Sequence, residues 1–236
     1  MSPDRDACGG FADQRGRTGR MIARHVVWFP WSTWGEWVRG WALCRDAPEP
    51  VEEHDGFRVD VGRVGHRVRY VIRGTGSVRE RAALTAPGTW LKVAAPREDV
   101  LPLLGPEWSV GAPEYLMSVA LGGVGAPGVV PDGYRVEVAG ERGFHEVVVV
   151  GLGGGPAARG RFSVRGGAAV VDQVVTEPEH RRRGLGKLVM GLMSVAAARR
   201  GAGVAVLVST VEGRLLYESL GWRVESDVVA AHVPEL

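Results

Sequence analysis

The sequence comprises 236 residues with a formal net charge of +2; 45% of the residues are hydrophobic, 24% are charged and 35 are glycine. This length allows one large domain or two small ones, with a buried core that needs no metal or disulfide support. The composition excludes collagen-like, coiled-coil and fully disordered chains, and the small net charge argues against a protein that coats nucleic acid.

Arginine replaces lysine almost everywhere in this chain. Of the 29 lysine and arginine residues, only Lys92 and Lys187 are lysine. We attribute the bias to a GC-rich genome. Arginines therefore indicate a binding site only where several of them share a specific geometry.

The start of the chain is polar and lacks the apolar stretch of a signal peptide, so we expect residues 1–22 to form a disordered tail, with Met21 as an alternative start. Cys8 and Cys44 fit neither a disulfide framework nor a metal site and are expected to be free thiols. No run of about 18 apolar residues occurs, which predicts a cytoplasmic protein without a membrane span.

A stripe of tryptophans marks the first expected helix. The spacing of three, three and four residues places one side chain per turn on a single helix face. We expect this helix from Thr33 to Cys44, opened by a capping box of Thr33 and Glu36. The stripe either packs in a core or interface, which we favour, or lines an acceptor pocket. Its members are Trp31, Trp34, Trp37 and Trp41.

Residues 23–121 are otherwise expected to form an α/β region of short elements. Alternating apolar residues and turn signals predict strands at Phe57–Val61, Val68–Ile72, Trp90–Ala94 and Tyr115–Leu121, and helices at Val78–Leu84 and Pro96–Leu104. Residues 122–133 hold five glycines and two prolines and form the expected linker.

Residues 134–236 are expected to form a second region of strands followed by a strand–helix–strand crossover, which implies parallel or mixed pairing. A strong helix is predicted from Gly184 to Arg199, and a second helix, opened by a capping box of Ser209 and Glu212, ends at Leu220. The expected strands are Tyr134–Val138, Glu146–Gly151, Arg161–Val164, Ala168–Thr176, Val204–Val208, Trp222–Val224 and Val228–Val233.

The most informative segment joins an apolar strand to the start of the first of these helices. Gly184 and Gly186 let a phosphate approach backbone amides that have no partner within the helix, at the positive end of the helix dipole. The surrounding cationic side chains suit a pyrophosphate; they are Arg181, Arg182, Arg183 and Lys187. A P-loop is a poor match because Leu188 follows the lysine, and a dinucleotide-binding fingerprint lacks its third glycine.

The segment resembles the central signature of the GNAT superfamily of acyl-CoA N-acyltransferases, Arg/Gln-x-x-Gly-x-Gly/Ala, which reads here Arg181-Arg182-Arg183-Gly184-Leu185-Gly186. A later signature of that family, a tyrosine ahead of Leu-Gly-Phe/Trp, resembles Tyr217 to Trp222. The resemblance covers about Tyr134 to Val233. It implies an α/β fold of the α+β type: a mixed, mostly antiparallel twisted sheet flanked by helices.

The resemblance implies an acetyl-CoA-dependent N-acetyltransferase. The strands at 168–176 and 204–208 would splay apart, and backbone groups of Val174 and Thr176 would pair with the pantetheine arm. Tyr217 would protonate the leaving thiolate. The expected cofactor-binding residues are Val174, Val175, Thr176, Arg181, Arg182, Arg183, Gly184, Leu185, Gly186, Lys187 and Ser209, with no metal.

A base must take the proton of the acceptor amine. Asp172 is the first candidate, because strand alternation would place Asp172, Val174 and Thr176 on one face; it could instead pair with an arginine or cap a turn. A water chain could also serve. Weaker candidates are His145 and Glu146, together with Glu179 and His180, which are expected to orient the anion loop.

Two departures from the family stand out. Thr210 and Gly213 occupy positions usually held by Asn and Ala, and the seven residues between Val138 and Glu146 leave no room for the two helices that the family has there. Either residues 23–121 supply those helices or they are a divergent GNAT-like repeat.

Three functions remain open from the sequence. The first is acetyl transfer from acetyl-CoA to a primary amine of a small molecule, by direct attack in a ternary complex. The second is the same chemistry on a protein N-terminus, a lysine or an aminoacyl-tRNA. The third is a non-catalytic acyl-CoA-binding module. A homodimer is compatible with the resemblance, and no membrane partner is expected.

Overall fold

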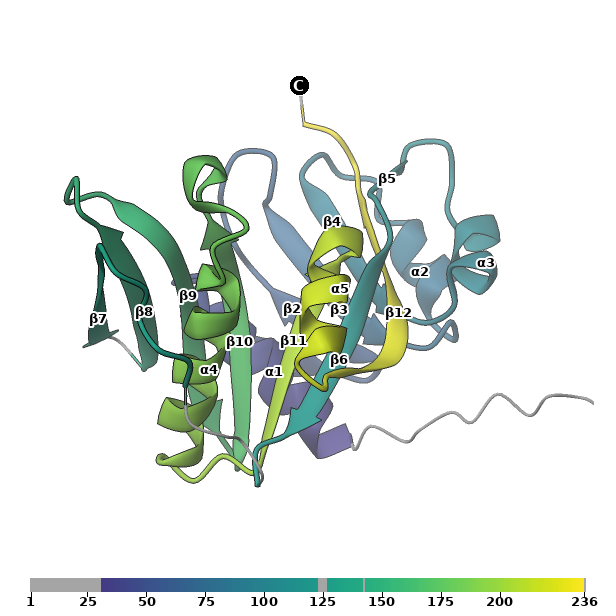
Figure 1. Cartoon of the computed structure of the whole chain (residues 1–236). Helices are drawn as coiled ribbons and strands as arrows, with labels where there is room; N and C mark the ends of the chain where they lie inside the picture. Colours follow the sequence, from purple (N-terminus) through teal and green to yellow (C-terminus); the bar gives the residue numbers. More distant parts are fainter. Residues whose placement is uncertain (1–30, 123–126, 142, 236) are drawn as a thin grey trace, which may run out of the picture.

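The computed structural model of the chain describes residues 31–122, 127–141 and 143–235 (Figure 1). The expected tail, with Cys8, and residues 123–126 of the expected linker lie outside these ranges. A twelve-stranded sheet runs through the molecule, with helices on both faces. Most neighbouring strands are antiparallel, which confirms the expected α/β fold class.

Most predicted elements are present with small shifts in their ends. The strands expected at Trp222–Val224 and Val228–Val233 form one strand, the strand expected from Arg161 begins at Pro156, and the short strands Val51–Glu53 and Ser109–Val110 were not predicted. Residues 31–122 form α1 (Trp31–Cys44), β1 (Val51–Glu53), β2 (Gly56–Val59), β3 (Val68–Arg73), α2 (Val78–Ala82), β4 (Thr89–Ala94), α3 (Arg97–Val100), η1 (Leu101–Leu103), β5 (Ser109–Val110) and β6 (Glu114–Ala120). The later residues form β7 (Tyr134–Glu141), β8 (Phe144–Gly151), β9 (Pro156–Arg165), β10 (Ala168–Thr176), η2 (Pro178–His180), α4 (Leu185–Ala198), β11 (Val204–Thr210), α5 (Val211–Ser219) and β12 (Arg223–His232).

The order of the strands is nearly symmetric about the centre of the sheet: β1-β2-β3-β4-β12-β6-β11-β10-β9-β8-β7. Two antiparallel pairs lead to the parallel pair β3–β4 on one side, and three antiparallel pairs lead to the parallel pair β10–β11 on the other. The last strand of each region pairs with the other region: β6 with β11, and β12 with β4. The regions before and after the expected linker therefore share one sheet, in an arrangement that a divergent repeat would produce.

Strands β7 and β8 form a tight hairpin that leaves no room for a helix between them. Helix α1 packs across β9 and β10 and covers this face of the sheet instead. The expected capping box at Thr33 is wrong, because the helix already begins at Trp31 and Thr33 lies inside it. Trp34, Trp37 and Trp41 are at most 5% exposed. Their burial agrees with the favoured interpretation of the stripe as core.

Two hydrophobic clusters occupy the two faces of the sheet around β10 and β11. One lies under α1 and includes Trp34, Val170 and Val206. The other lies under α4 and α5 and includes Ala169, Met193 and Tyr217. The functional site described below lies where β10 and β11 separate between these clusters. Within the described ranges, no helix is long and apolar enough to cross a membrane.

Candidate active site

The centre of the site is a gap between two parallel strands. Strands β10 and β11 pair from Ala168 with Val204 to Val170 with Val206, and among the described residues no further pairs join them. Each strand remains paired on its outer side, β10 with β9 and β11 with β6. Backbone groups on the facing edges beyond Val170 and Val206 are therefore without a strand partner, as the splayed arrangement predicted.

A bulge changes the faces of β10 at this gap. Asp172 lies opposite Arg161 but Val175 lies opposite Arg159, so β10 carries one extra residue, and Gln173 has a left-handed φ of 54°. Asp172 keeps the face of Val170, toward α1, and the extra residue after it moves Val174 to the opposite face, where it packs against the cluster under α4. The expectation that Asp172, Val174 and Thr176 share one face is therefore wrong.

The loop between β10 and α4 sets the backbone conformation at the start of α4. It passes through the short helix η2 and two left-handed positions, Arg182 with a φ of 63° and Gly184 with a φ of 77°. Gly184 is the N-cap residue of α4. A Cβ atom at Gly186 would lie 3.2 Å from Leu216 Cδ2, tighter than ordinary contacts, so the glycine allows α4 to approach α5 closely.

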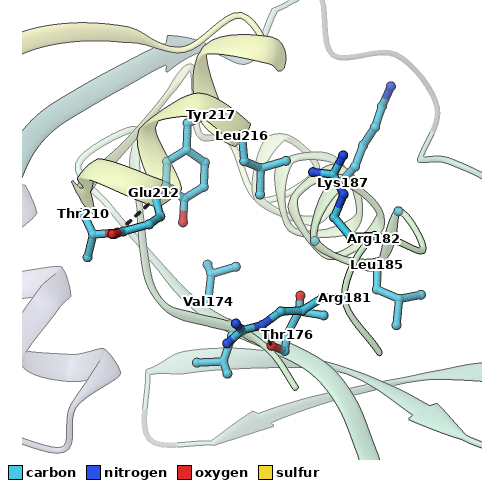
Figure 2. A pocket seen from close by; sticks show the side chains of 14 residues that line it. Val174, Thr176, Arg181, Arg182, Leu185, Lys187, Thr210, Glu212, Leu216 and Tyr217 are labelled. Atoms are coloured by element: carbon cyan, nitrogen blue, oxygen red, sulfur yellow. Dashed lines mark hydrogen bonds between the residues drawn. The ribbon is translucent and has the colours of Figure 1, made fainter. Parts of the chain in front are cut away.

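A cavity of about 770 Å³ opens between this loop, the gap and α5 (Figure 2). In Figure 2 the ring of Tyr217 reaches into the cavity from α5, with Val174 and Thr176 across from it and Arg182 and Lys187 at one side. The lining residues are Val174, Val175, Thr176, Arg181, Arg182, Gly184, Leu185, Gly186, Lys187, Thr210, Glu212, Gly213, Leu216 and Tyr217. Most of the residues expected to bind acetyl-CoA thus surround one space.

Two of the expected cofactor residues lie elsewhere. The first is Arg183, whose guanidinium donates to the Tyr134 hydroxyl at 3.1 Å, and that hydroxyl lies 2.9 Å from His180 Nδ1. Arg183 and His180 therefore connect the anion loop to Tyr134 of β7. Ser209 is buried, with its hydroxyl 3.2 Å from the sulfur of Met117. The expected capping box at Ser209 is also wrong, because β11 continues through Thr210, whose hydroxyl accepts from the Gly213 amide.

Tyr217 is 8% exposed and its ring lies 5.9 Å from that of Trp222. Burial, together with the negative charge of Asp172, raises the pKa of its hydroxyl to about 12, so the phenol stays protonated at neutral pH. A Cβ atom at position 213 would come within 3.2 Å of the Tyr217 ring. The family departure at Gly213 therefore leaves room for the position that the ring adopts.

A second cavity of about 250 Å³ lies on the other side of the gap, toward α1. It shares Val174, Thr210, Gly213 and Tyr217 with the first cavity. Its other lining residues are Trp37, Trp41, Arg45, Lys92, Glu114, Val171, Asp172, Gln173, Leu207, Val208 and Ser209. Core packing and pocket lining, the two interpretations of the tryptophan stripe, therefore both apply, since Trp37 and Trp41 are buried and also line a cavity.

Asp172 lies in this second cavity and forms an ion pair. The Arg45 guanidinium donates to both of its carboxylate oxygens, at 2.5 Å and 3.0 Å. The alternative raised from the sequence, pairing of Asp172 with an arginine, is thus present. Other base candidates are in different surroundings: Glu146 pairs with Arg161 at 2.9 Å, and the His145 ring stacks on Phe162.

Of the residues that the second cavity takes from residues 31–122, sequence reasoning considered Trp37 and Trp41 but missed Arg45, Lys92 and Glu114. One signal was available. Lysine occurs only at positions 92 and 187 among 29 basic residues, and the two lysines line the two cavities.

Comparisons with known proteins agree with this geometry. The family model of the acetyltransferase (GNAT) domain matches residues 143–224. Three similar solved structures are a GCN5-related N-acetyltransferase from Kribbella flavida, a GCN5-related N-acetyltransferase-like protein from Streptococcus suis 89/1591 and a GCN5-related N-acetyltransferase from Sphaerobacter thermophilus. A comparison with curated proteins gave no match.

These structures are distant in sequence and close in fold. The Kribbella protein is 18% identical with a TM-score of 0.61, covering 86% of this chain and 95% of its own. The Streptococcus protein is 13% identical with a TM-score of 0.57, covering 90% and 97%. The Sphaerobacter protein is 13% identical with a TM-score of 0.54, covering 76% and 77%. Residues 143–224 match the GNAT acetyltransferase domain and the fold is shared with GNAT structures, which confirms the resemblance; the domain match supports acyl transfer from acyl-CoA.

Proposed function

We propose that the protein transfers the acetyl group of acetyl-CoA to a primary amine of a small acceptor, by direct attack within a ternary complex. The observation that carries the proposal is the place of Tyr217 between two cavities. The larger cavity contains the anion loop, the smaller contains Asp172, and Tyr217 lines both.

The larger cavity is the proposed acetyl-CoA site. The free amides at the start of α4 bind the pyrophosphate, with Arg181, Arg182 and Lys187 as counter-charges. The unpaired edge of β10 at Val174–Thr176 accepts the pantetheine arm in the way that a sheet edge accepts an added strand. The Thr176 carbonyl already accepts a hydrogen bond from Arg181 Nε at 3.2 Å, so this group is shared with the loop.

The smaller cavity is the proposed acceptor site. Its volume of about 250 Å³ lies below the range of roughly 300–1,000 Å³ that is usual for drug-sized ligands, which favours a small acceptor over a macromolecular one. The acceptor nitrogen attacks the thioester carbonyl carbon, a C–N bond forms and the C–S bond breaks. Asp172, alone or through water, takes the amine proton, and Tyr217 gives its phenolic proton to the departing sulfur.

The test is release of free thiol from acetyl-CoA with a panel of primary amines, with the acetylated product identified by mass. We expect amine-dependent release, and a fall in kcat of about 10²-fold or more in Tyr217→Phe, because proton transfer to the leaving group is lost. Tyr70→Phe is the matched control, since Tyr70 packs in a separate cluster around α2. Binding of CoA without turnover of any amine would contradict the proposal and favour an acyl-CoA-binding module.

A further inference from the structure

The acceptor cavity is unusual in the charges that it buries. Lys92 and Asp172 side chains are 12% and 13% exposed, Glu114 is 25% exposed, and Arg45 lies nearer the surface at 45%. They come from four elements: Arg45 follows α1, Lys92 is on β4, Glu114 on β6 and Asp172 on β10. Buried charges are costly unless they are paired, so four converging charges at a cavity call for an explanation.

The charges form two pairs at the wall of the cavity. Arg45 holds Asp172 through two hydrogen bonds, and Lys92 Nζ lies 3.1 Å from Glu114 Oε2. Burial lowers the pKa of Lys92, and the Glu114 carboxylate opposes this effect. Each pair therefore offers a cation and an anion to the same small space.

A third cation lies behind the wall. Arg69 is 8% exposed, its guanidinium lies 4.6 Å from the Trp41 ring centre and 5.2 Å from that of Trp90, and its Nε is buried with no hydrogen-bond partner among the described residues. Burial and the charge of Arg45 lower its pKa to about 10, so it remains charged at neutral pH.

The buried cluster therefore has an excess of positive charge. It holds three cations, Arg45, Arg69 and Lys92, against two carboxylates, Asp172 and Glu114. His66 adds no charge, because burial and the neighbouring cations lower its pKa to about 3. One further carboxylate would balance the cluster.

We propose that the acceptor is a small amino acid, that is, an amine that also bears a carboxylate. The inference rests on the proposed function and names the substrate class of its acceptor site. The acceptor carboxylate binds at Lys92, which lines the cavity and lies within the influence of the excess positive charge of Arg69. Its amine lies at the Asp172 end, beside Tyr217, because Asp172 and Tyr217 line the same cavity. Such a ligand places each of its charges against the opposite charge of the cavity.

The experiment compares acceptors that differ only in the carboxylate. The pairs are L-phenylalanine and phenethylamine, L-leucine and 3-methylbutylamine, and β-alanine and ethylamine, each assayed for kcat/KM with acetyl-CoA. We expect the carboxylate-bearing member of at least one pair to be preferred by about 10- to 100-fold, the value of a charge-assisted hydrogen bond. Equal or better use of the decarboxylated amines would overturn the inference and leave the proposed function intact. No turnover of either member in every pair would overturn the proposed function itself.

A double variant tests whether Lys92 binds the carboxylate of the acceptor. Lys92→Met with Glu114→Gln removes one cation and one anion together, so no new unpaired charge is buried. We expect the preference ratio to fall about tenfold or more, mostly through a higher acceptor KM. Lys92→Arg, which keeps the charge, should retain a preference, and Arg223→Met, at the exposed first residue of β12, is the control for a lost surface cation. An unchanged ratio in the folded double variant would also overturn the inference.

Discussion

The Tyr217 hydroxyl and the Asp172 carboxylate face the same small cavity from different strands and helices, and they interact through their charges. Burial alone raises the pKa of Tyr217, and the negative charge of Asp172 raises it further, to about 12. Asp172 in turn is held by Arg45. A protonated phenol and an oriented carboxylate thus lie on the two sides of the place where the acetyl group is proposed to move.

This relationship predicts the alkaline behaviour of Tyr217. Because its pKa lies above the usual tyrosine value near 10, it should remain protonated, and competent as an acid, until about pH 12. In Asp172→Asn one of the two causes is gone, so the pKa should fall and the phenol should ionise at lower pH. The pKa of Tyr217 in each protein is measured by pH titration of the tyrosinate absorbance, taken as the difference from the counterpart that carries Tyr217→Phe. Ionisation of Tyr217 near pH 10 in the unmodified protein would contradict the structure.

The left-handed glycine at the start of α4 predicts a selective loss of acetyl-CoA binding. Gly184→Ala forces a side chain into a φ of 77°, at a cost of about 1–2 kcal/mol, and displaces the amides that are proposed to hold the pyrophosphate. Gly201→Ala is the matched control, because Gly201 has a φ of 87° just after the other end of the same helix and lines neither of the two cavities described above.

Urea unfolding and calorimetry with CoA separate the two effects. We expect similar losses of stability in both variants, and a raised dissociation constant for CoA only in Gly184→Ala. Equal binding by the two variants would show that the start of α4 does not hold the cofactor.

Much of this architecture is predictable from local patterns. The helix expected at Gly184–Arg199 is observed as α4 at Leu185–Ala198, because its apolar spacing and flanking glycines are local signals. The bulge at Gln173 was not predictable, because it arises from the pairing of β10 with β9, and strand alternation alone places Val174 on the same face as Asp172, which is wrong.

The acceptor cavity was beyond sequence reasoning for a similar reason. Trp41, Lys92 and Glu114 lie on three elements that only the shared sheet brings together, since β12 and β6 stand between β4 and β11. No spacing rule connects residues that far apart along the chain. The local traces of the site were the tryptophan stripe and the rarity of lysine, and the second was informative only once both lysines were located.

Asp172 is expected to act on the chemical step. Asp172→Asn keeps the shape of the side chain but removes its charge, so kcat should fall by about 10²-fold or more while the KM for acetyl-CoA changes little. Asp60→Asn is the control, since Asp60 pairs with Arg58 at 3.3 Å on the surface. Steady-state kinetics with one amine acceptor would decide; an effect confined to the acceptor KM would assign Asp172 to positioning of the amine rather than to proton transfer.

The interleaved strands predict that the described regions unfold together. Because β6 pairs with β11 and β12 pairs with β4, neither region can lose its strands without exposing the other. Arg81→Met probes this from the side remote from the α4 loop: Arg81 donates to Asp55 at 2.7 Å and 2.6 Å, and both side chains are at most 10% exposed.

Loss of a buried partner should therefore cost about 3–5 kcal/mol. We expect a single urea transition in the unmodified protein, and in Arg81→Met a single transition at lower urea. Both are followed by circular dichroism and by tryptophan fluorescence, which reports mainly on residues 31–122, where six of the eight tryptophans lie. Arg135→Met, which removes an exposed pair with Glu137, should cost no more than about 1 kcal/mol. The opposite result would be two separate transitions, of which Arg81→Met shifts only the first. That result would mean that residues 31–122 unfold as an independent domain and that the strands at the centre of the sheet do not couple the two regions.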